Sequence, residues 1–208
     1  MTTARSLLPG LLLALACTVA GAQAPAPAAK PDLAKGEATS KGVCGACHTN
    51  DGSRGLPANP ILQGQHPEYI VKQLAEFKAD KRQSPIMKGF ASSLSDEDMK
   101  NVAAFYGTKQ AQPGFARNKD LAALGEKIWR GGIASRHIAA CAGCHGPNGS
   151  GIPSQYPRLA GQHAEYTEAQ LKAFRAGTRA NSAQMTGIAA EMTDKEIAAV
   201  SDYVAGLR

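Results

Sequence analysis

Two copies of one five-residue pattern constrain this chain more than any other feature. Cys44-Gly45-Ala46-Cys47-His48 recurs as Cys141-Ala142-Gly143-Cys144-His145. C-x-x-C-H is the attachment pattern of haem c, in which each thiol adds to a vinyl group and the histidine lies under the iron. C-x-x-C alone is also compatible with a zinc half-site, a redox pair or a disulfide. A zinc site needs a second ligand pair nearby, which neither copy has, and a redox pair does not need the histidine. The sequence therefore predicts two covalently attached haem c groups.

The chain around these motifs is duplicated at an offset of 97 residues. Aligned identities include Pro60 with Pro157, Gly64-Gln65-His66 with Gly161-Gln162-His163, Tyr69 with Tyr166 and Arg82 with Arg179; one residue later in register, Met87 matches Met185. We expect an N-terminal domain over residues 34–109, a linker over 110–119 and a C-terminal domain over 120–208. Domains this small bury little surface unaided, so each haem would supply much of its domain's core.

Each copy has the pattern of helices joined by loops, without strand-like alternation. First helices are expected near residues 36 and 121, and a second helix over 68–80 with a counterpart in the other copy. Ser95 and Thr193 are good N-caps for the last helices, and Glu196 completes a capping box with Thr193. The predicted fold class is all-α.

Residues 1–22 predict a cleaved secretory signal peptide, with Arg5, an apolar core and an A-x-A site ending at Ala22. The apolar run is shorter than the ~20 residues of a spanning helix. A lipoprotein site at Cys17 is an alternative reading of the same segment. Residues 23–33 form an Ala/Pro-rich tether. Export predicts a periplasmic protein, since bacteria attach haem c outside the cytoplasm.

His48 and His145 are the predicted proximal ligands, from their place in the motif. A ligating imidazole needs its other N–H held by an acceptor. Pro60 and Pro157 lie twelve residues downstream of the two histidines. Proline has no N–H, so these segments are free to offer a carbonyl.

The order of the motifs resembles class I cytochrome c. C-x-x-C-H is followed by Pro-x-Leu-x-Gly, here Pro60-Ile61-Leu62-Gln63-Gly64 and Pro157-Arg158-Leu159-Ala160-Gly161, and then by a lone Met before a capped C-terminal helix. Two such domains in one exported chain resemble the dihaem cytochrome c4 family, over about residues 34–208. The resemblance implies that the carbonyls of Pro60 and Pro157 accept the hydrogen bond of the proximal histidines. An eight-residue insertion at 133–140 departs from the pattern beside the second haem edge but leaves the ligation unchanged.

The sixth ligands are expected to be Met87 and Met185, by resemblance and loop length. The other candidates are Met99, Met192, His137, His66 and His163. The two other methionines suit core packing, and His137 has no counterpart in the first copy. His66 and His163 are the serious rivals because both are duplicated. They lie at the start of a helix, however, in a loop that a class I fold does not bring across the distal face.

Tyr69, Tyr166, Arg82 and Arg179 also recur in both copies. They are candidate donors to the haem propionates, which are buried anions that need hydrogen-bond partners. The alternative is that the tyrosines pack with a wet hydroxyl and the arginines are solvated. The sequence leaves both roles open.

A haem iron held by His and Met has no open coordination position, and Met raises its reduction potential relative to His. We therefore expect an electron carrier and not an enzyme. By resemblance it would pass electrons from a quinol-oxidising complex to a terminal cytochrome c oxidase. The alternative is a cytochrome subunit of a periplasmic dehydrogenase complex. The net charge of +6 permits docking to an acidic redox partner. No nucleic-acid motif is present, and peripheral membrane association stays open.

Overall fold

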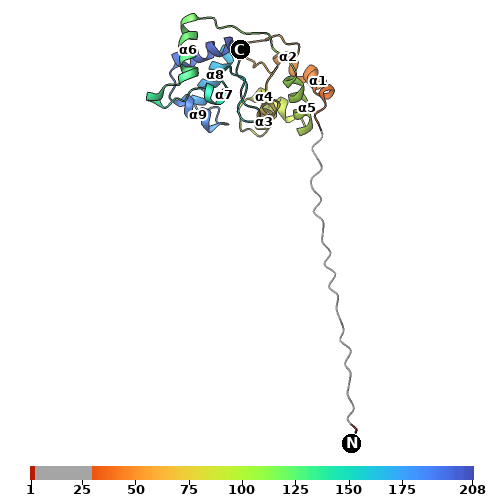
Figure 1. Cartoon of the computed structure of the whole chain (residues 1–208). Coiled ribbons are helices and arrows are strands. Elements are labelled where there is room, and N and C mark those ends of the chain that lie inside the picture. The colour runs from red at the N-terminus through yellow and green to blue at the C-terminus, as the bar shows by residue number, and fades with distance from the viewer. Residues whose placement is uncertain (3–29) are drawn as a thin grey trace. The chain divides into compact units, whose positions relative to one another are not determined.

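The computed structural model describes residues 1–2 and 30–208 (Figure 1). The predicted signal peptide, Cys17 and most of the Ala/Pro-rich tether lie outside the described residues. Within them, β-pairing is limited to two isolated bridges, Ile133–Ile138 and Ile152–Tyr156. No helix in this part of the chain is both long and apolar enough to cross a membrane. The predicted all-α fold class is confirmed.

The first copy begins with a helix that runs through a π-helical turn into its C-x-x-C-H motif. Its elements are α1 (Leu33–Thr39), η1 (Ser40–Cys44), α2 (Gly45–His48), α3 (Pro67–Lys78), α4 (Pro85–Ser92) and α5 (Asp96–Gly107). Asp32 caps α1 through hydrogen bonds from the amides of Ala34 and Lys35. The first helix therefore begins a few residues earlier than expected.

The second copy repeats this order of helices. Its elements are α6 (Lys119–Gly131), the 3-10 turn η2 (Ala134–Arg136), α7 (Ala142–His145), α8 (Ala164–Arg175), α9 (Ala183–Ala190) and α10 (Asp194–Gly206). The predicted N-caps start both last helices, and both form full capping boxes, Ser95 with Asp98 and Thr193 with Glu196. Residues 110–118 contain no helix and connect the two copies.

In each copy the first and last helices pack closely at a glycine (Figure 1). A Cβ added to Gly36 in α1 would lie 2.1 Å from the backbone oxygen of Asn101 in α5. A Cβ on Gly125 in α6 would lie 2.2 Å from the backbone oxygen of Ala199 in α10. Backbone cannot yield as a flexible side chain does, so only glycine fits at these two crossings.

We expect Gly125→Ala to lower the free energy of unfolding of the haem-loaded protein by about 2–3 kcal/mol, since overpacking here meets backbone. Denaturant titration followed by circular dichroism measures the loss. Gly131→Ala is the matched control, because that glycine ends the same helix with no atom within 4 Å of an added Cβ. Equal stability of the two variants would contradict a tight crossing.

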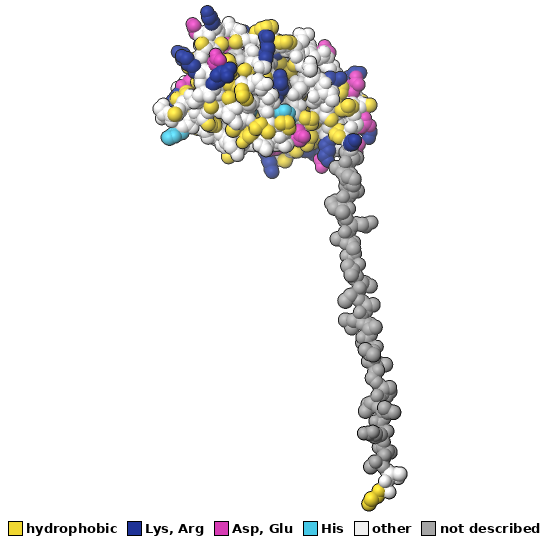
Figure 2. All heavy atoms as spheres, in the orientation of Figure 1, with side chains coloured by type: hydrophobic (Ala, Val, Ile, Leu, Met, Phe, Trp, Pro, Cys, Tyr) yellow, Lys and Arg dark blue, Asp and Glu magenta, His cyan; other side chains and the backbone are white. Residues whose placement is uncertain are grey.

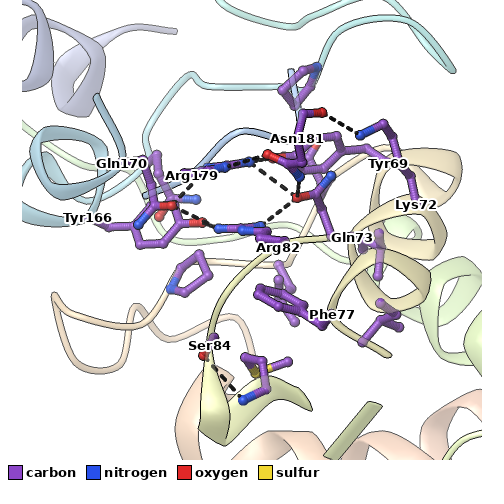
Figure 3. Close-up of a pocket in the computed structure, with 18 of the residues that line it drawn as sticks. Tyr69, Lys72, Gln73, Phe77, Arg82, Ser84, Tyr166, Gln170, Arg179 and Asn181 are labelled. Carbon is purple, nitrogen blue, oxygen red and sulfur yellow. Dashed lines mark hydrogen bonds between the residues drawn. The ribbon is translucent and has the colours of Figure 1, made fainter. Parts of the chain in front are cut away.

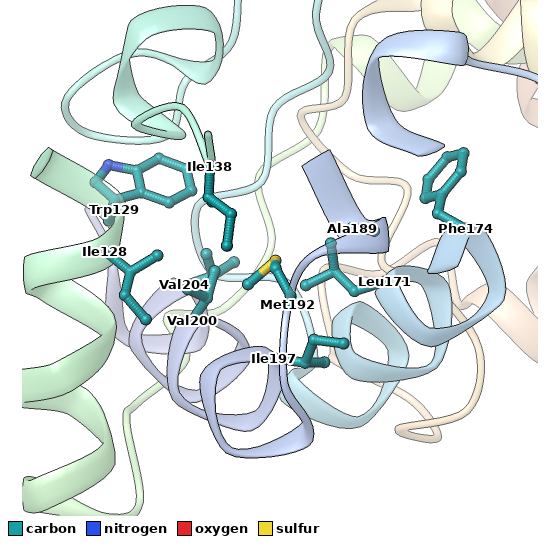
Figure 4. Close-up of a cluster of buried hydrophobic side chains, with 10 residues drawn as sticks. All are labelled: Ile128, Trp129, Ile138, Leu171, Phe174, Ala189, Met192, Ile197, Val200 and Val204. Carbon is teal, nitrogen blue, oxygen red and sulfur yellow. The ribbon is translucent and has the colours of Figure 1, made fainter. Parts of the chain in front are cut away.

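The buried apolar cores extend up to the predicted site residues. The second copy buries Ile128, Trp129, Ile138, Leu171, Phe174, Ala189, Met192, Ile197, Val200 and Val204 (Figure 4). The first copy has a smaller cluster, Ile70, Val102, Ala103, Phe105 and Tyr106. Cys44 packs against the first cluster, and Cys141 and Met185 against the second. The first cysteine of each motif therefore lies against a buried apolar cluster.

The insertion at 133–140 is a folded loop anchored in the second core. Ile138 is 2% exposed and pairs with Ile133 through an isolated bridge. Arg136 hydrogen-bonds the Glu196 carboxylate and the Glu191 carbonyl. The inserted loop beside the second motif is therefore anchored to α10 through Glu196.

Candidate haem-binding site

The two C-x-x-C-H motifs occupy equivalent short helices. Cys44 ends η1, whereas Cys47 and His48 lie in α2; Cys141 caps α7, which contains Cys144 and His145. All four thiols are free, so neither motif forms the disulfide considered from the sequence. Burial raises the pKa of the Cys44 and Cys141 thiols to about 11, and both are protonated at neutral pH.

Each motif histidine is oriented by the proline twelve residues further on. Nδ1 of His48 lies 2.9 Å from the carbonyl oxygen of Pro60, and Nδ1 of His145 lies 3.0 Å from that of Pro157. A carbonyl only accepts, so Nδ1 carries the proton and Nε2 keeps its lone pair. Burial lowers the pKa of both rings, against a smaller opposite effect of the proline carbonyls. Both imidazoles are therefore neutral near pH 7, in the tautomer that a metal ligand needs.

One cavity of about 720 Å³ reaches the candidate ligands of both copies. Its wall contains His48 and Met87 from the first copy and His145 and Met185 from the second. Most of the remaining wall is apolar, including Leu62, Leu74, Phe77, Leu159 and Phe174. Among the described residues no group of three or more His, Cys, Asp or Glu is placed to hold a bare metal ion. A large apolar cavity with one histidine and one methionine per copy fits a macrocycle that brings its own metal.

Met87 and Met185 lie in short helices and not in the loops that were expected. Met87 is the third residue of α4, and its amide donates to the N-cap side chain of Ser84 at 3.3 Å. Met185 is the third residue of α9, where the Ser182 side chain accepts at 3.4 Å. The missed signal was Ser84-Pro85, an N-cap followed by proline at the first helical position. The serine caps thus fix the backbone conformation at Met87 and Met185.

None of the five alternative ligands lines this cavity. Met99 and Met192 are 1% and 3% exposed within the helical cores, and His137 is exposed on the insertion. His66 Nε2 lies 2.9 Å from the carbonyl oxygen of Ser150, and His163 Nε2 lies 2.7 Å from that of Arg54. Each of these two rings thus forms a hydrogen bond with the opposite copy. This structural role explains why both histidines recur in the duplicated chain although neither lies where it could bind iron.

Arg82 and Arg179 cross between the copies in one buried hydrogen-bonded cluster (Figure 3). Arg82 donates to the Tyr166 hydroxyl at 2.9 Å, and Arg179 donates to the Tyr69 hydroxyl at 3.1 Å. Gln73 and Gln170 accept from both arginines. Each arginine is 8% exposed, and its guanidinium lies over a phenyl ring, that of Phe77 or Phe174. The arginines are therefore not solvated, and the alternative of a wet surface position is wrong for them.

The fold and the site define a c-type cytochrome with two haem-binding copies in one chain. The family model described as "Cytochrome c" matches residues 122–208. A second family model, "Cytochrome C oxidase, cbb3-type, subunit III", matches residues 31–105.

The chain is 46% identical over 191 residues to cytochrome c4 from Thiocapsa roseopersicina, covering 90% of this chain and 98% of that protein. The structure of reduced recombinant cytochrome c4 from Pseudomonas stutzeri matches with a TM-score of 0.81 at 39% identity, over 86% of this chain and 100% of that one. A thiosulfate dehydrogenase electron acceptor from Stutzerimonas stutzeri is 40% identical over 172 residues, 79% of each chain. The chain belongs to the cytochrome c4 family of electron carriers, and its cofactor is covalently bound haem c.

Proposed function

We propose that this chain is a periplasmic electron carrier whose two haems are each closed by one histidine and one methionine. The observation that carries the proposal is the single apolar cavity whose wall contains both His/Met pairs. Cys44 and Cys47 would hold the first haem through thioethers, and Cys141 and Cys144 the second. When bound, each haem supplies a one-electron couple between Fe(III) and Fe(II).

The residues of the chain set the properties of that couple. His48 and His145 present Nε2 because their Nδ1 protons are held by proline carbonyls. Met87 and Met185 would complete the coordination, and a thioether favours the reduced iron. The apolar side chains of the cavity wall would keep water from the iron. With one histidine and one methionine bound to each iron, no coordination position would be open to a substrate, which supports a carrier and not an enzyme.

Arg82 and Arg179 are proposed to face haem propionates, together with Tyr69 and Tyr166. Neither guanidinium has a carboxylate within ion-pair distance in the described part of the chain. The nearby Glu76 carboxylate pairs instead with Lys72, whose side chain is 49% exposed. An unpaired buried cation is costly, and two propionates would supply the missing negative charge. Both arginines line the cavity that contains the ligands.

The rim of the first site suits transient docking of a redox protein. Ile86 and Phe90 are 71% and 44% exposed on the helix that bears Met87. In the second copy the position of Ile86 is taken by Gln184. Basic side chains are scattered over the face shown in Figure 2 and mixed with acidic ones. We propose that apolar contact at the first site, with modest positive charge around it, brings partners to the first haem.

The partners proposed from the family are a quinol-oxidising complex as donor and a terminal cytochrome c oxidase as acceptor. The relative described as a thiosulfate dehydrogenase electron acceptor favours a second candidate, a periplasmic dehydrogenase as donor. Stopped-flow mixing of the oxidised protein with each class of reduced donor separates the two. The faster second-order reduction identifies the physiological class.

The reduced protein is expected to bind carbon monoxide slowly at neutral pH, because Met87 and Met185 close both irons. Flash or stopped-flow absorption measures the rate. Met87→Ala is the matched variant and should bind carbon monoxide rapidly at half of the haem, since only one iron is opened. Rapid binding by the unaltered protein would favour an enzymatic role.

A further inference from the structure

Gln65 and Gln162 each clamp the backbone of one residue in the opposite copy. Oε1 of Gln162 accepts from the Ile61 amide at 2.9 Å, and its Nε2 donates to the Ile61 carbonyl at 3.0 Å. Gln65 makes the same pair of bonds with Arg158, both at 2.9 Å. Both glutamines are only 8% exposed. The two contacts are equivalent by the duplication, and each spans the boundary between the copies.

Each of these contacts lies directly behind the proline carbonyl that holds a motif histidine. The Ile61 amide belongs to the same peptide group as the Pro60 carbonyl, which accepts from Nδ1 of His48. The Arg158 amide likewise shares a peptide group with the Pro157 carbonyl, which accepts from Nδ1 of His145. One peptide group therefore joins each motif histidine to a glutamine of the other copy.

We infer that these two hydrogen-bond relays make each copy set the reduction potential of the other copy's haem. Gln162 would act on the first haem through His48, and Gln65 on the second through His145. The inference rests on the proposed function in one respect, that the two histidines are iron ligands. Both glutamines belong to the cavity wall, but they are positioning residues, because each would act on its iron only through a proline carbonyl and a histidine.

The physical basis is the cooperativity of hydrogen bonds in series. An acceptor at the Ile61 N–H draws electron density toward the Pro60 oxygen, which then holds the His48 proton more strongly. The imidazole becomes a more basic ligand, and a more basic ligand favours Fe(III). Gln162 therefore lowers the potential of the first haem, and removing its oxygen raises it. Gln65 has the same effect on the second haem.

The test is a redox titration of the full-length haem-loaded protein as Gln162→Met and as Gln65→Met. Methionine keeps the length of the side chain and removes the donor and acceptor. Proton NMR of the haem methyl groups, each assigned through contacts with its own copy, follows the two haems separately.

In Gln162→Met the ratio of reduced to oxidised first haem at a fixed applied potential should rise about threefold. This magnitude follows if loss of the Gln162 acceptor weakens the hydrogen bond between His48 and Pro60 by about 10–30%. At 59 mV per tenfold this is a rise of about 30 mV. The second haem should be unchanged, and Gln65→Met should give the reverse pattern.

A purely structural clamp predicts a different result. Loosening the boundary admits water to both sites, and water stabilises the more highly charged Fe(III), so both potentials would fall together. His66→Leu is the control, because it removes a side-chain bond to Ser150 across the same boundary and keeps the backbone amide of residue 66, which donates to Oε1 of Gln65 at 3.0 Å. This variant should not raise the reduction potential of the haem in the opposite copy. A parallel fall in both haems, or a shift in the glutamine's own copy, would overturn the inference.

A second measurement needs no variant. In the reduced, 15N- and 13C-labelled protein, a scalar coupling should connect the Ile61 amide nitrogen with the side-chain carbonyl carbon of Gln162, and Arg158 with Gln65. Absence of both couplings overturns the relay. Failure of the proposed function is recognised separately, because an oxidised spectrum without the sulfur-to-iron band would remove the methionine ligands and leave the couplings at Ile61 and Arg158 in place.

Discussion

The Cys44→Ala, Cys47→Ala double variant is expected to lose about half of the protein's helical circular dichroism. Without thioethers the first haem is not retained, and the first copy then depends on its buried apolar residues alone, of which Ile70, Val102, Ala103, Phe105 and Tyr106 form one cluster. Burial on that scale does not offset the conformational entropy of a domain of this length. Far-ultraviolet circular dichroism of the purified variant measures the loss.

The matched variant is Cys141→Ala, Cys144→Ala. The second copy buries thirteen apolar residues against ten in the first, among them Trp129 and Ile138, both without counterparts in the first cluster. We expect it to retain more of its helicity than the first copy does when its own haem is missing. Full helicity in the Cys44→Ala, Cys47→Ala variant would show that the haem is not part of the first core.

Met87→His is expected to lower the potential of the first haem well below that of the second. The change replaces a soft thioether by an imidazole, which stabilises Fe(III) more. A spectroelectrochemical titration should therefore separate into two clear waves. The weak sulfur-to-iron band at the red end of the oxidised spectrum should fall to about half, because Met185 still contributes its share.

His66→Ala is the control for that experiment. The His66 ring donates to the Ser150 carbonyl and does not line the cavity, so its loss should leave the band intact and produce no second wave. If His66→Ala splits the titration and Met87→His does not, the ligand assignment is wrong. The high-potential carrier would then have to be replaced by a bis-histidine protein.

Local sequence signals predicted most of the helices. Ser95 and Thr193 begin α5 and α10 as expected, because capping depends on residues three positions apart. The sequence predicts the first helix near residue 36, whereas the Asp32 cap begins α1 at Leu33. The short helix around Met87 was missed in the same way, although Ser84-Pro85 is a start signal.

Contacts between the copies could not be predicted from the sequence. Duplication singled out Arg82 and Gln65, but it does not say whether a repeated side chain turns to its own copy or to the other. Arg82 reaches Tyr166, and Gln65 reaches Arg158, each across more than 80 positions of chain. Such pairings depend on how two finished domains pack together, and no local pattern encodes that packing.

The most direct test of the account is the oxidised and reduced absorption spectrum of the unaltered protein, taken with a haem count per chain. We expect two haem c per chain, and a sulfur-to-iron band twice as strong as in Met87→His. One haem per chain, or two haems without that band, would contradict ligation of both irons by histidine and methionine.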